Sequence, residues 1–166
     1  MSINSLHYFN AHTRTDEDVQ RTFIVRKQVL KEILTGIANE EEYSIAQHYM
    51  VIGSRGMGKS TLLKMLEIEL RTGDIRNQFI PVLFPEEQYN LDRLSKFWLN
   101  CLDALADTFE QEQNEQETKA LDQLIKALEK VTDENTLADQ AYDAVIAICK
   151  RYGRRPVLLV DNIDIL

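Results

Sequence analysis

Cysteines and long apolar runs are both scarce in this sequence of 166 residues. The two cysteines, Cys101 and Cys149, have no metal-type spacing, and both lie in apolar helical stretches, so we expect reduced structural thiols. No apolar run is long enough to cross a bilayer, and the first residues lack the basic and apolar regions of a secretory signal. These absences predict a cytoplasmic protein without a membrane span.

Acidic residues outnumber basic ones by 27 to 19, which gives a formal net charge of −8. This balance argues against polyanion binding by the chain as a whole. The three histidines have no metal-ligand spacing. One basic cluster, Lys150, Arg151, Arg154 and Arg155, is expected to complement the C-terminal end of a helix, with a nucleic-acid contact or a subunit interface as the alternative. The acidic residues 110–117 are predicted to form a solvated loop.

Apolar periodicity predicts an α/β protein. Helices are expected over residues 25–39, 59–71, 90–111, 118–131 and 137–152. Short apolar runs predict strands at 49–52, 79–84 and 156–161, and Pro81 indicates that the second of them lies at a sheet edge. Because these strands are nearly continuous apolar runs that alternate with helices, the sheet is expected to be parallel. The polar residues 1–20 are expected to form an arm or a short helix.

One segment, residues 53–60, matches the pattern G-x-x-x-x-G-K-[ST] in full. Its glycines permit backbone angles that direct successive N–H groups into one concavity at the start of a helix, where a triphosphate is cradled. In this motif the lysine reaches the β- and γ-phosphates, and the serine hydroxyl binds Mg²⁺. The pattern predicts an ATP and Mg²⁺ site made of Gly53, Ser54, Arg55, Gly56, Met57, Gly58, Lys59, Ser60 and Thr61.

A second candidate, Asp161, follows the apolar run Val157-Leu158-Leu159-Val160. Ligands of open α/β sheets bind at the carboxyl ends of the strands. An aspartate there holds the Mg²⁺ shell in P-loop enzymes, so Asp161 and Ser60 are the predicted metal-side residues. The alternative is that Asp161 only ends a strand or caps the next helix.

Three segments, VIGSRGMGKSTLLKML, PVLLVDNID and FIVRKQVLKEIL, together resemble the AAA+ and STAND P-loop ATPases, particularly the origin-recognition-initiator-like branch. The resemblance implies a three-layer αβα fold with a parallel sheet of order 5-1-4-3-2, of which the chain holds strands one to three of about five. The third segment resembles the family's F-x-G-R stretch beside the adenine pocket. It assigns Phe23, Ile24 and Val25 to the adenine side and Arg26 to fixing the segment. Val25 stands where glycine is usual, and packing on the core is the alternative.

The same resemblance bears on domain organisation. Without the fourth strand, the sheet would leave backbone groups unpaired. We therefore expect residues 21–166 to be the N-terminal portion of an ATPase domain, with its remaining parts beyond Leu166, and residues 1–20 to be an arm. Oligomerisation or partner binding is expected through regions outside this portion.

The family continues from the strand-end aspartate into glutamate, the base that activates the attacking water, whereas here Asn162 follows Asp161. An amide orients water but does not take its proton. Either Asp164 substitutes or hydrolysis is slow, so the catalytic candidates are Lys59, Asp161, Asn162 and Asp164. The predicted function is ATP binding and hydrolysis that drive conformational change in a larger protein. The alternatives are a nucleotide-gated switch with little hydrolysis and a DNA-handling initiator-type ATPase.

Overall fold

The computed structural model describes residues 15–39, 48–84 and 92–161. These residues form two compact units, one within residues 1–69 and one within residues 70–166. The first unit contains the glycine-rich motif, and the second contains the sheet and Asp161. Each unit is described by itself below.

The first unit contains α1 (Asp16–Thr22), α2 (Lys27–Ala38) and most of α3 (Lys59–Thr72). The hydroxyl of Thr15 caps α1 by accepting from the backbone N–H of Asp18, and Val19 is buried. On α3, the ammonium of Lys64 lies 2.8 Å from a carboxylate oxygen of Glu67 and 3.5 Å from one of Asp16. Residues 16–22 thus form a short helix, whereas the rest of the segment predicted as an arm or short helix, residues 1–14, lies outside the described residues.

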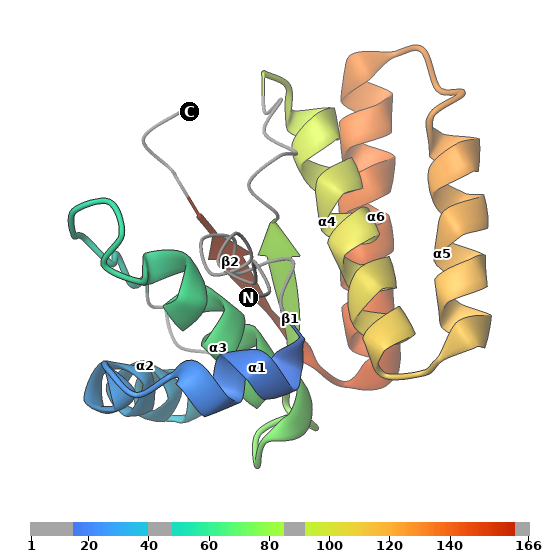
Figure 1. The fold of residues 1–166 in the computed structure, drawn as a ribbon. Coiled ribbons are helices and arrows are strands. Elements are labelled where there is room, and N and C mark those ends of the chain that lie inside the picture. Colours follow the sequence, from blue (N-terminus) through green and yellow to red (C-terminus); the bar gives the residue numbers. More distant parts are fainter. Residues whose placement is uncertain (1–14, 40–47, 85–91, 162–166) are drawn as a thin grey trace, which may run out of the picture. The chain divides into compact units, whose positions relative to one another are not determined.

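The second unit pairs β1 (Phe79–Phe84) with β2 (Arg155–Val160) in parallel, with Phe79 opposite Arg155 and Phe84 opposite Val160. Three helices, α4 (Leu94–Gln111), α5 (Glu115–Leu128) and α6 (Glu134–Tyr152), lie side by side (Figure 1). Alternate side chains of β1 pack with these helices in one apolar core that includes Ile80, Val82, Phe84, Leu102, Leu105, Phe109, Leu121, Val145 and Ile148.

This sheet confirms the predicted parallel pairing but not the three-layer fold. Its two strands are the second and third of the expected set, which are neighbours in the order 5-1-4-3-2. The prediction of a solvated loop over residues 110–117 is wrong, because α4 extends to Gln111 and α5 begins at Glu115. Glu112 and Glu117 accept hydrogen bonds from arginines near the end of α6, and these pairs fold the acidic segment onto the unit.

The edge of β1 away from β2 is closed to further pairing at two positions. The carbonyl of Gln78 accepts from the backbone N–H of Arg155, so the backbone groups of Phe79 and Pro81 point away from β2. There Arg154 Nε donates to the Phe79 carbonyl at 2.9 Å, and the Thr108 hydroxyl donates to the Pro81 carbonyl at 2.8 Å. Pro81 has no N–H to offer. Within the described sheet, β1 is the edge strand that this proline predicts.

Burial is expected to protect both cysteine thiols from thiol-reactive reagents in the native protein. Cys101 and Cys149 are both buried, and desolvation raises the pKa of Cys101 to about 12 and that of Cys149 to about 11. At pH 8 both thiols are protonated in the native state, and the thiolate is the reactive form. We expect Ellman's reagent to label neither cysteine in native protein and both in guanidinium chloride. Rapid labelling of either thiol before unfolding would contradict this burial.

Candidate functional site

The glycine-rich loop, residues 53–58, precedes α3 directly. Gly56 and Gly58 have φ values of 82° and 76°, in the left-handed region that side chains with a Cβ rarely adopt. A Cβ built at either position meets no atom within 4 Å. Backbone conformation, and not lack of space, therefore accounts for glycine at both positions. The loop therefore has the positive-φ turns that the glycines of the sequence motif allow, and the space around both glycines is open.

Lys59 is the first residue of α3 and ties the beginning of the loop to the helix. Its ammonium donates to the carbonyl oxygen of Gly53 at 2.7 Å and to that of Ser54 at 3.3 Å. The backbone N–H of Met57 donates to the same Ser54 carbonyl at 3.3 Å. The positive charge of Lys59 is thus held next to the positive end of the helix dipole, an arrangement that attracts anions.

The prediction that residues 49–52 form a buried strand is wrong for this structure. This lead-in segment has no strand assignment, and the side chains of Met50 and Ile52 are 74% and 84% exposed. A strand needs a neighbour for its backbone groups, and the only ladder in the described part of the chain joins β1 to β2. The lead-in therefore exposes apolar side chains that the sequence pattern predicts to be buried.

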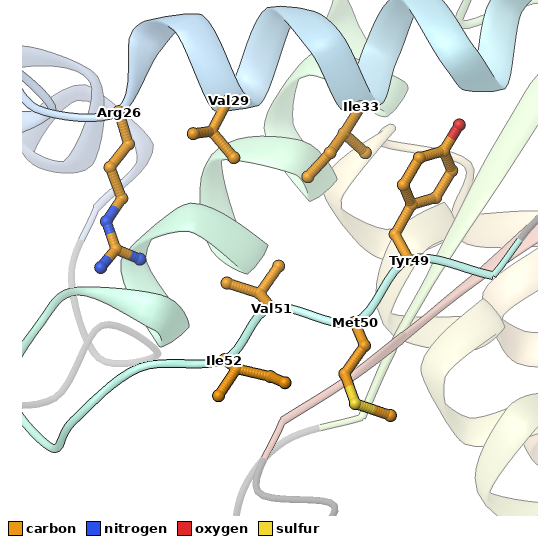
Figure 2. Close-up of a pocket in the computed structure, with 7 residues that line it drawn as sticks. All are labelled: Arg26, Val29, Ile33, Tyr49, Met50, Val51 and Ile52. Atoms are coloured by element: carbon orange, nitrogen blue, oxygen red, sulfur yellow. The ribbon is translucent and has the colours of Figure 1, made fainter.

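A pocket of about 480 Å³ lies between the lead-in and α2 (Figure 2). The walls are apolar except at Arg26, and the lining residues are Arg26, Val29, Ile33, Tyr49, Met50, Val51 and Ile52. Arg26 precedes α2 with a φ of 71°, an uncommon conformation for a residue other than glycine. Its guanidinium lies 3.9 Å from a Cβ built on Gly53. The pocket therefore begins beside the first glycine of the loop.

The three residues predicted for the adenine side are not among those that line this pocket. Phe23 is buried, whereas Ile24 and Val25 are among the most exposed large apolar side chains, and none of the three lines the pocket. The signal for two lining residues is present in the sequence, since Val29 and Ile33 are four residues apart on one helical face. Sequence reasoning assigned them to a helix but not to a site.

Asp161 follows β2 directly and is buried, with 3% of its surface exposed. It lies in the second unit, whereas Lys59 and Ser60 lie in the first. The other two catalytic candidates, Asn162 and Asp164, lie outside the described residues.

The three arginines of the basic cluster, at the end of α6 and just after it, contact other groups of the second unit. The guanidinium of Arg151 donates to Glu117 at 3.0 and 3.1 Å. Arg154 makes two bonds to Glu112, and the guanidinium of Arg155 stacks on the ring of Phe79 at 4.5 Å. Lys150 and Arg151 lie in the last turn of α6, as the sequence predicts, and the arginines of the cluster also contact residues that are distant in sequence.

Residues 15–39, 48–84 and 92–161 contain no group of three histidine, cysteine, aspartate or glutamate side chains that could hold a metal ion. Over the same residues, none of the helices has the length and apolar character needed to cross a membrane.

A parallel strand pair with packed helices and a glycine-rich loop that opens a helix are compatible with a partial α/β fold of the P-loop type. A family model described as ORC-CDC6-like matches residues 4–136. The chain therefore belongs to the ORC-CDC6-like family, an AAA+-related family of nucleotide-binding, initiator-like modules, which confirms the predicted resemblance at this level. Searches of curated proteins and of solved structures give no match.

Proposed function

We propose that this chain binds ATP with Mg²⁺ through residues 53–61 and acts as the nucleotide-binding part of an AAA+-type ATPase. Its nucleotide state would then change the conformation of a larger assembly. One observation carries the proposal. The G-x-x-x-x-G-K-S loop has both inner glycines in the left-handed region and leads directly into a 14-residue helix that begins at the motif lysine.

The residues present fit a bound triphosphate. The open space around Gly56 and Gly58 leaves room for phosphate oxygens close to the backbone. Lys59 lies at the positive end of α3, and we propose that its ammonium exchanges the two loop carbonyls for phosphate oxygens. Ser60 and Thr61 in the first turn supply hydroxyl groups, of which that of Ser60 would hold Mg²⁺.

The proposed metal-side carboxylate is Asp161. Mg²⁺ prefers oxygen ligands and keeps several waters, so one hydroxyl and one carboxylate are a sufficient protein contribution. When bound, the ion neutralises the charge that develops on the transferred phosphoryl group. The part of Asp161 would be to hold this ion through a water, as the sequence position after an apolar strand suggests.

The pocket beside α2 is the proposed site for the nucleotide base. Its walls come from Val29, Ile33 and the lead-in, which suits the faces of a purine, and Arg26 at one end offers donors only. Phe23, which is buried and lies three residues before Arg26 in the sequence, remains a proposed adenine-side residue. Ile24 and Val25 remain proposed adenine-side residues through their backbone.

Asn162 supports slow hydrolysis, and therefore a second candidate function as a nucleotide-gated switch. An asparagine orients the attacking water without accepting its proton. Phosphoryl transfer depends mainly on positioning and electrostatics, so turnover would be slowed and not abolished. A DNA-handling role has less support, because Arg151, Arg154 and Arg155 contact groups of their own unit.

Replacing Lys59 with alanine tests the proposal. We expect a fluorescent ATP analogue, titrated in the presence of Mg²⁺, to bind the variant about ten- to a hundredfold more weakly, since a charge-assisted hydrogen bond contributes about 1.5–3 kcal/mol. Lys126→Ala on the exposed surface of α5 is the matched control, because it removes the same charge elsewhere. Thermal unfolding of each variant checks that the fold is retained. Equal binding by wild type and Lys59→Ala would refute the assignment.

A further inference from the structure

Gly36 lies inside α2, where glycine is the least favourable helix residue apart from proline. The structure gives a steric reason for its presence. A Cβ built on Gly36 would overlap the hydroxyl of Tyr49 and lie 2.9 Å from the Cζ of that ring. Both approaches are closer than any at Gly53, Gly56, Gly58 or Gly153, and both involve the same side chain. The ring of Tyr49 therefore occupies the space that any larger residue at position 36 would need.

This contact extends the apolar stripe of α2. Val29, Ile33 and Gly36 are spaced four and three residues apart, so they share one face of the helix. Val29 and Ile33 line the pocket, and Tyr49 lines it from the lead-in. Figure 2 shows the ring of Tyr49 directed toward α2 at one end of the pocket, with Arg26 at the other. Gly36 thus lets the lead-in approach the helix closely at that end.

The lead-in needs such contacts because it has no ladder partner among the residues described. Gly53 comes four positions after Tyr49, a span of about 13 Å in an extended chain. The place where the glycine-rich loop begins is therefore set by the contacts of the lead-in with α2, together with the hydrogen bond from Lys59 to the Gly53 carbonyl. One of these contacts is that of Tyr49 with Gly36, where a Cβ would require the end of the Tyr49 side chain to move.

We propose that Gly36 and Tyr49 are positioning residues for the nucleotide site: the ring seated on the glycine fixes the lead-in against α2 and so sets where the glycine-rich loop begins. This inference rests on the proposed function of that loop. A change at position 36 is therefore expected to act on nucleotide binding without touching the nucleotide.

The test is a double-mutant cycle on Gly36→Ala and Tyr49→Ala, read as the affinity for a fluorescent ATP analogue with Mg²⁺. Alanine at position 36 displaces the ring, and we expect it to weaken binding about three- to tenfold when Tyr49 is present. In the Tyr49→Ala background the ring is gone and the added methyl group has room, so the same change should alter binding by less than twofold. The melting temperature should fall by a few degrees with Gly36→Ala alone and rise with it in the Tyr49→Ala background, since alanine favours the helix.

Thr35→Ala is the matched control, because it raises helix propensity at the adjacent, exposed position and leaves the ring in place. It should leave nucleotide affinity unchanged. If Gly36→Ala binds like wild type, or if it weakens binding equally in both backgrounds, the positioning role is overturned while nucleotide binding stands. If wild type binds no better than Lys59→Ala, the proposed function itself fails and the positioning role falls with it.

Discussion

Replacing Asn162 with glutamate is expected to raise the steady-state rate of ATP hydrolysis about a hundredfold, the lower end of what a positioned general base contributes. The increase is expected because the side chain after Asp161 would gain a group that accepts the proton of the attacking water. Asparagine holds a water by hydrogen bonds, but it has no basic site for the proton that the water loses on attack. A glutamate, one methylene longer, supplies that site and keeps the ability to orient the water. Phosphate release measured at saturating ATP and Mg²⁺ gives the rate.

Two variants make this result specific. Asn162→Gln lengthens the side chain as glutamate does but stays an amide, so it should leave the slow rate unchanged. Adding Lys59→Ala to Asn162→Glu should remove the gain, because the activity must come from the proposed site. If the wild-type protein already hydrolyses ATP as fast as Asn162→Glu, the proposal of a switch with little hydrolysis is refuted, and Asp164 becomes the candidate base. In that case Asp164→Asn would slow hydrolysis.

Local sequence signals predict the elements of the second unit well, because each is encoded within one segment. The apolar run at residues 79–84 is a strand, and Pro81 correctly predicts its place at the sheet edge, since a residue without an N–H cannot complete a ladder. Gly153, with a φ of 61°, ends α6 as predicted. Such signals act over a few residues, and the chain obeys them wherever packing agrees.

Contacts between distant segments lie beyond this kind of prediction. Glu117 is an acidic residue in an acidic run, and nothing near it in sequence shows that it is buried with Arg151 and Tyr152 at its carboxylate. The prediction of a buried strand for the lead-in is wrong for a related reason. Its apolar pattern is that of a buried strand, but a strand becomes buried only when neighbours cover it. In the same way, the sequence alone does not explain a glycine inside α2, because the reason is the contact of Gly36 with the side chain of Tyr49.

Arg154 illustrates this limit and carries the largest expected effect on stability. Its guanidinium makes hydrogen bonds of 2.9 and 2.7 Å to the two carboxylate oxygens of Glu112, just after α4, and its Nε donates to the Phe79 carbonyl at the start of β1. The side chains of Arg154 and Glu112 are only 10% and 23% exposed. The planar guanidinium of Arg154, two residues after the end of α6, thus contacts both the residue after α4 and the first residue of β1. Lysine cannot reproduce this geometry.

Arg154→Ala is therefore expected to lower the free energy of unfolding by about 2–3 kcal/mol, because it leaves a largely buried carboxylate and a strand carbonyl without their donor. Thermal or urea unfolding measures the loss, which corresponds to a fall in melting temperature of roughly 5–10 °C for a chain of this size. Lys119→Ala is the control, since it breaks a 3.1 Å pair with Glu115 in which both side chains are mostly exposed, and should change stability by less than about 0.5 kcal/mol.

The charge left behind, and not the lost attraction, should dominate the cost of Arg154→Ala. Replacing both partners with methionine, Arg154→Met with Glu112→Met, removes the whole ion pair and leaves no buried carboxylate. We expect this double variant to be more stable than Arg154→Ala, although it contains one more substitution. A double variant less stable than Arg154→Ala would mean that the ion pair itself, with its two short hydrogen bonds, holds α4 and β1 together.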